Sequence, residues 1–131
     1  MNLITQVGTQ LSANLPSFVT VSKALTSKPL EDIDAEIPAA YYYLAGIQSE
    51  ASPYNNATIQ PGEYTVAVDL VCQADDLEAL FAELRGALAG WQPSGGSWEA
   101  MEHVSGDNQG ISGGIVWWRE MFAARNYQGE V

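Results

Sequence analysis

EYTVAVDLVCQADDLEALFAELRGALAG, residues 63–90, decides the fold of this chain because its hydrophobic period changes midway. In residues 64–72 apolar and β-branched residues alternate with small or polar ones, which is typical of a half-buried strand. From Leu77 onward the apolar residues recur at spacings of three and four, which form the stripe of an amphipathic helix. The inward face of the strand is predicted to be Val66, Val68, Leu70 and Cys72. The stretch therefore predicts a strand that turns directly into a helix.

The ends of this helix are also marked in the sequence. Asp75 is a suitable N-cap, and Glu78 three residues later completes a capping-box pattern. Gly90 stands where a helix often ends on a left-handed residue, and Pro93 prevents continuation. We expect the helix to run between Asp75 and Gly90.

Length and composition limit the possible function classes. The 131 residues suit one domain, residues 1–131, and no apolar run is long enough to span a membrane. No signal peptide is recognisable, and Cys72 is the single cysteine, so we expect folding in the cytoplasm without a disulfide. Sixteen acidic residues against five basic ones give a net charge of −11, which disfavours tight binding of nucleic acid.

The remaining segments predict an α+β fold. We expect a helix at residues 2–15, a second short helix at 29–36, and a strand at 39–49, while residues 18–21 could be a strand or the start of a helix. Residues 50–61 read as a long loop, 97–104 as a weakly alternating strand, 105–113 as a turn-rich hairpin tip and 114–125 as a strong strand. The assembled prediction is a mostly antiparallel sheet of about four strands, with one long helix and one or two shorter helices.

Metal and catalytic sites are poorly supported. Glu99, Glu102, His103 and Asp107 are the closest approach to a metal-binding set, but the chain has no second histidine. A solvated strand edge with a surface histidine is the favoured interpretation, so no catalytic, metal or cofactor residue is predicted. Asp69, in the middle of a strand, could be a perturbed carboxylate that requires a charged partner, or it could mark the solvent-exposed face of the sheet. A small enzyme or ligand-binding domain using Asp69 or residues 99–107 remains the less favoured alternative.

Aromatic residues are more numerous than one small core readily holds. Tryptophan and tyrosine are enriched at protein interfaces, and both faces of strand 114–125 carry bulky residues, so subunit contacts are expected. The two loops 50–61 and 105–113 are natural arms for reaching partners. The candidate interface residues are Tyr41, Tyr42, Tyr43, Trp98, Trp117, Trp118, Arg119, Tyr54, Asn55, Asn56, Asp107 and Asn108.

The order of these segments resembles the small tail-terminator, or tail-completion, proteins of tailed phages and Mu-like prophages. The resemblance lies in Pro38-Ala39-Ala40 entering a strand, in the helix that ends with Leu88-Ala89-Gly90-Trp91-Gln92-Pro93, and in a closing strand with Trp117 or Trp118 followed by Phe122. It covers about residues 1–125 and is carried by order and spacing.

The resemblance implies a structural virion protein without cofactors, located in the tail or neck and assembled in the host cytoplasm. Such proteins form a ring, commonly a hexamer, that caps the finished tail tube, stops its polymerisation and joins the head-side connector. The implied partners are further copies of the chain, the tube protein, the connector protein and possibly a sheath, with DNA passing through without tight binding. Another neck or head–tail adaptor protein is the alternative within this class.

Overall fold

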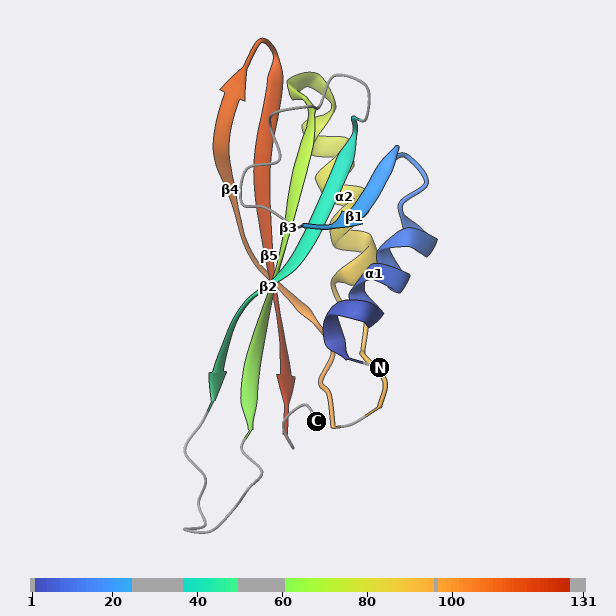
Figure 1. Cartoon of the computed structure of the whole chain (residues 1–131), viewed down its shortest axis with the longest axis vertical. Coiled ribbons are helices and arrows are strands. Elements are labelled where there is room, and N and C mark those ends of the chain that lie inside the picture. The colour runs from blue at the N-terminus through green and yellow to red at the C-terminus, as the bar shows by residue number, and fades with distance from the viewer. Residues whose placement is uncertain (1, 25–36, 50–60, 96, 128–131) are drawn as a thin grey trace.

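A computed structural model describes residues 2–24, 37–49, 61–95 and 97–127, which form a five-stranded sheet with two helices on one face (Figure 1). The strand order is β1-β2-β3-β5-β4, with β1 parallel to β2 and every other pair antiparallel. The elements are α1 (Leu3–Asn14), β1 (Thr20–Lys23), β2 (Ala39–Ser49), β3 (Gly62–Gln73), a 3-10 turn (Ala74–Asp76), α2 (Leu77–Leu88), β4 (Glu102–Ser112) and β5 (Ile115–Asn126).

The α+β class is as predicted, but the sheet is mixed and has a fifth strand. The ambiguous segment 18–21 contributes the start of β1, because the backbone amides of Val19 and Thr20 donate to the Pro38 carbonyl and align this segment with β2. The two described α-helices are equally long, at 12 residues each, which differs from the predicted long and short helices.

The central strand β3 is buried on both faces, so the prediction of a half-buried strand was wrong. Val66, Val68 and Leu70 are fully buried on the helix side, and Ala67 and Asp69 on the other side are 0% and 2% exposed. The reason is topological: β3 lies between β2 and β5 along nearly its whole length, and their larger side chains flank both of its faces.

The α2 boundaries were predicted correctly at one end only. A 3-10 turn separates β3 from α2, so Asp75 lies inside that turn and Asp76 takes the N-cap position without a side-chain capping bond. The predicted capping box is therefore absent. At the other end, Gly90 has φ +84°, the left-handed conformation that the sequence predicted.

Helix α1 confirms the helix expected near the N-terminus and buries one apolar face. Leu3, Val7, Leu11 and Leu15 are buried in the core cluster, where they meet β-strand residues and α2. The side-chain amide oxygen of Asn2 accepts from the Thr5 backbone amide at 2.9 Å and caps the helix. Gly8 lies under the Tyr42 ring, where an added Cβ would stand 2.7 Å from Tyr42 Cζ. Gly8 therefore permits close contact between α1 and β2.

The hairpin of β4 and β5 is longer than predicted. Residues 105–112 belong to β4 and not to a hairpin tip, because β5 offers backbone partners up to Ile115 and two bulges absorb the irregular sequence. The turn is confined to Gly113 and Gly114, both with positive φ. The predicted strand 97–104 is also corrected: β4 begins at Glu102, and Trp98 makes only an isolated bridge to Asn126.

Two predicted elements cannot be compared with the structure. The helix expected at 29–36 and all of the loop expected at 50–61 except Pro61 lie outside the described residues. None of the described helices is both long and apolar enough to span a membrane.

Candidate subunit interface

The sheet face opposite the helices carries a compact polar and aromatic cluster. Arg119 on β5 and Asp69 on β3 lie directly across from one another in the register, and their side chains form a two-pronged ion pair. Arg119 Nε donates to Asp69 Oδ1 at 2.8 Å, and Nη2 donates to Oδ2 at 3.1 Å. The guanidinium carbon lies 5.7 Å from the Tyr43 ring centre and 5.6 Å from that of Trp117, within cation–π range. We call these four residues the Arg119 cluster.

Charge and burial in the Arg119 cluster shift two pKa values. Burial raises the pKa of Tyr43 above its ordinary value, and the neighbouring Asp69 carboxylate adds to the rise while Arg119 opposes it. Hydrogen bonding to Asp69 raises the pKa of Arg119. Of the two interpretations of Asp69 that the sequence left open, the carboxylate with a partner is correct. The solvent-exposed interpretation was wrong, because the Asp69 side chain is 3% exposed.

The indole of Trp117 contributes an unused hydrogen-bond donor to this face. Its Nε1 atom is buried and has no acceptor among the described residues. Buried donors are usually paired, and leaving one unpaired costs about 1–3 kcal/mol. An acceptor brought by another molecule would satisfy this group.

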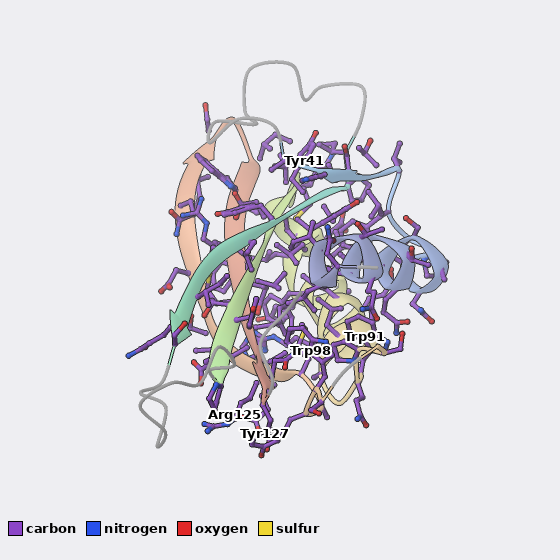
Figure 2. All side chains as sticks on the ribbon, turned by 60° about the horizontal axis from the view of Figure 1, so that its bottom comes forward. Tyr41, Trp91, Trp98, Arg125 and Tyr127 are labelled. Carbon is purple, nitrogen blue, oxygen red and sulfur yellow. The ribbon has the colours of Figure 1, made fainter. Side chains whose placement is uncertain are left out.

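The other predicted interface residues are divided between the two faces. Tyr41 pairs with Asp69 in the register and so belongs to the face of the Arg119 cluster, and Figure 2 shows it at the opposite end of the molecule from Arg125 and Tyr127. Asp107 lies across from Arg119 on β4 and is exposed. Asn108 is exposed as well, and its Oδ1 accepts from the Gly110 amide at 2.8 Å.

Three predicted interface aromatics lie on the helix side instead. Trp98 is 5% exposed and makes an edge contact with Tyr64, with ring centres 5.0 Å apart. Trp118 stacks on Phe81 of α2, and Tyr42 packs against the core beside Gly8. Trp98 and Trp91 appear close to the helices in Figure 2. Trp98 thus belongs to the core of the subunit, and Tyr42 and Trp118 are half-buried side chains packed against it. Tyr54, Asn55 and Asn56 lie outside the described residues.

A buried carboxylate on the helix side was not predicted from the sequence. Glu120 is fully buried, and its Oε1 accepts from Arg85 Nη2 and from Trp118 Nε1, each at 2.8 Å. Its Oε2 contacts His103 Nε2. His103 is therefore a half-buried partner of Glu120 and not the surface residue that we expected. No local pattern links α2, β4 and β5, so the sequence carried no signal for this contact.

The sequence analysis also did not predict the exposed aliphatic residues on two edges of the sheet. Leu44 and Ile47 on β2 are 39% and 51% exposed, although both are large aliphatic residues. Ile111 on β4 is 64% exposed. The absence of charge in residues 43–49 was a signal available in the sequence, because edge strands usually carry charges or proline.

The described residues offer no obvious site for a metal. Among residues 2–24, 37–49, 61–95 and 97–127, no three His, Cys, Asp or Glu side chains are grouped so that they could hold an ion. Cys72 is buried, and burial, aided by the charge of Asp76, raises the pKa of its thiol to about 11.

Comparisons with known proteins address the fold and the family of the chain. No curated protein matches the chain. A solved structure with the same fold, described as the virion of a native gene transfer agent particle, superposes with a TM-score of 0.66 at 19% identity, over 97% of this chain and 95% of the other.

The family comparison is more specific. The model of the phage tail terminator protein matches residues 3–129, nearly the whole chain. This family consists of structural virion proteins and not of enzymes, and its members work with other components of the phage tail. The chain therefore belongs to the phage tail terminator family.

Proposed function

We propose that this protein forms a ring, commonly a hexamer in the proteins it resembles, that caps the end of the completed tail tube. The observation that carries this proposal is the family match over residues 3–129. The similar fold of a chain from the virion of a gene transfer agent particle supports a place within a tail-like particle.

The mechanism is occupation of an interface. A tube grows because each ring of tube protein presents a surface on which the next ring assembles. A terminator ring bound to that surface removes the site, so polymerisation stops. Its opposite surface then joins the head-side connector, and a sheath, where the tail has one, is a further possible neighbour.

The Arg119 cluster supports a role in contacts rather than in chemistry. Tyr43, Trp117 and Arg119 are only partly buried, and they lie on the sheet face that no described helix covers. Aromatic and arginine side chains are the residue types that dominate binding energy at interfaces. Tyr41 and Asp107 extend the same face to the neighbouring strands.

The strong negative charge supports passage of DNA through the ring without retention. The net charge of −11 repels phosphate groups, so acidic side chains lining a central channel would keep DNA mobile. Exchanging such acidic residues for neutral amides should slow DNA ejection, and an unchanged ejection rate would count against an acidic lining.

A head–tail adaptor is the second candidate within this structural class. An adaptor would bind the portal side of the neck, whereas a terminator binds the tube. Co-sedimentation with purified tail tubes and with purified connector complexes separates the two.

The direct test of ring formation is the solution mass by light scattering, with negative-stain images of the same sample. Both are recorded for the free protein and after addition of purified tail tubes. A closed ring of about six subunits in either sample supports the proposal. A chain that stays monomeric alone and leaves tube ends bare contradicts it.

A further inference from the structure

The outer edge of β2 is only partly covered. Strand β1 pairs with residues 39–42, and the Ala24 amide donates to the Tyr42 carbonyl at 2.9 Å. Along Tyr43–Ser49 no strand among the described residues pairs on this side. The segment YLAGIQS has no charged residue and no proline, the two devices that commonly protect an edge strand from pairing with another chain.

The opposite border of the sheet is formed by β4. Its residues pair with β5 on one side, and no strand of the described chain pairs on the other side. Among the described residues the sheet therefore has two long edges without a partner strand, residues 43–49 of β2 and residues 102–112 of β4, besides the four-residue outer edge of β1.

Three of the four exposed aliphatic residues on the two edges point to the same sheet face. Leu44 pairs with Val66, and Ile47 pairs with Tyr64; both of these β3 partners belong to the helix-side core. Ile111 pairs with Val116, which also belongs to that core. Directly paired residues of neighbouring strands point to the same face, and the bulge between Leu44 and Gly46 lets Leu44 and Ile47 share one face although they are three residues apart. Leu44, Ile47 and Ile111 therefore face the helix side of the sheet, whereas Val104, 59% exposed on β4, lies in a bulge and has no direct partner in the register. If the edges met, Ile111 of one copy would lie on the same face as Leu44 and Ile47 of the next, where cross-strand contacts between aliphatic side chains form.

Strand direction and charge are compatible with such a meeting. Successive antiparallel pairs from β2 through β3 and β5 to β4 make β2 and β4 run in opposite directions. Copies in the same orientation would therefore join β2 to β4 as an antiparallel pair. The β4 edge carries Glu102 and Asp107, whereas residues 43–49 carry no charge, so no like charges oppose each other.

We propose that residues 43–49 of β2 pair antiparallel with the free edge of β4 in a second copy of this chain. The proposal rests on the ring formation proposed above and names the contact that would build the ring. Two different edges meet, so the interface is head-to-tail, the type of contact that generates closed rings when the rotation closes.

The test compares lysine substitutions on the edges with a matched control. L44K and I47K place a charge on β2, and I111K places one on β4. V19K is the control, because Val19 is 65% exposed and lies outside both edges. We expect each edge variant to reduce the assembled fraction at least about tenfold, as a charge on an edge strand opposes pairing. V19K should assemble like the parent protein, and circular dichroism should show that all four chains remain folded.

Hydrogen–deuterium exchange of the parent protein separates strand pairing from side-chain contact. Backbone amides in residues 43–49 and 102–112 should exchange more slowly in the ring, or on capped tubes, than in the dissociated chain. Rings in which neither segment gains protection would overturn the edge pairing while leaving the proposed function intact. Absence of any ring, alone or on tubes, would overturn the proposed function and the edge pairing together. Normal assembly of all three edge variants would also overturn the pairing.

Discussion

Arg119 and Asp69 form a two-pronged ion pair across neighbouring central strands, 50 residues apart in the chain. The Asp69 side chain is 3% exposed, so Arg119 takes the place of water as its polar partner. The pair connects β3 and β5 on the face that is free of described helices and holds Arg119 between Tyr43 and Trp117. One contact thus joins the core of the sheet to its candidate interface.

R119M should destabilise the fold, because it leaves the buried Asp69 carboxylate without its cation. Removing one partner of a buried pair costs about 3–5 kcal/mol, and the partial exposure of Arg119 places the expected loss near the lower end. The double variant D69V/R119M should recover most of it. Urea unfolding of the parent and both variants measures these differences. A stability of R119M equal to the parent's would show that the pair does not hold the strands together.

Tyr43 should make the folded state sensitive to alkaline pH. Burial, with the Asp69 charge, raises the pKa of Tyr43 above its ordinary value of 10.0 in the folded protein. A raised acid pKa stabilises the folded state below the unfolded pKa, and this contribution is lost as pH rises through the folded value. The unfolding free energy should therefore fall above pH 10, and Y43F should lose less stability over the same range. Denaturant titrations from pH 8 to pH 11 would refute this if the two proteins responded alike.

The two helical glycines should respond oppositely to alanine. Gly86 on α2 has open space around it, so G86A should stabilise the protein by about 0.5–1 kcal/mol through helix propensity. Gly8 on α1 faces the Tyr42 ring, so the added methyl group of G8A requires that ring to move. We expect G8A to be less stable than the parent in thermal unfolding. Equal gains from both substitutions would mean that Tyr42 does not pack on α1.

Cys72 should resist alkylation in the folded protein. Its side chain is buried, and a pKa of about 11 leaves roughly a hundredfold less thiolate at pH 8 than the ordinary thiol pKa of 9.0 would. Iodoacetamide labelling followed by mass spectrometry measures the rate. In the variant S12C the exposed new cysteine on α1 is the internal reference and should react first. Equally fast labelling of both thiols would contradict the buried position of Cys72.

Features that depend on nearby residues were predictable, and those that depend on strand pairing were not. The strand and helix of residues 63–90 have strong local periods, and β2 matches its predicted range of 39–49. The length of β4 escaped prediction because glycines and polar residues in 105–112 look like a turn until β5 lies beside them. Burial of the second face of β3 likewise comes from its central position in the sheet.

The candidate interface was predictable in kind but not residue by residue. An excess of aromatic residues indicates contacts, yet Trp117 and Trp118 are adjacent and face opposite sides of β5, one in the Arg119 cluster and one against Phe81. Which side a strand residue faces follows from alternation, whereas which side the helices cover depends on the tertiary fold. The partnership of Asp69 with Arg119 required the register of two strands that the sequence alone does not align.

The most direct test of the central claim is the length of tail tubes assembled in vitro from purified tube protein, measured by negative-stain electron microscopy. If this chain terminates tubes, adding it to growing tubes stops elongation, leaves a ring at one tube end, and prevents further growth when fresh tube protein is supplied. Tubes that continue to lengthen at the same rate, with bare ends, would contradict it.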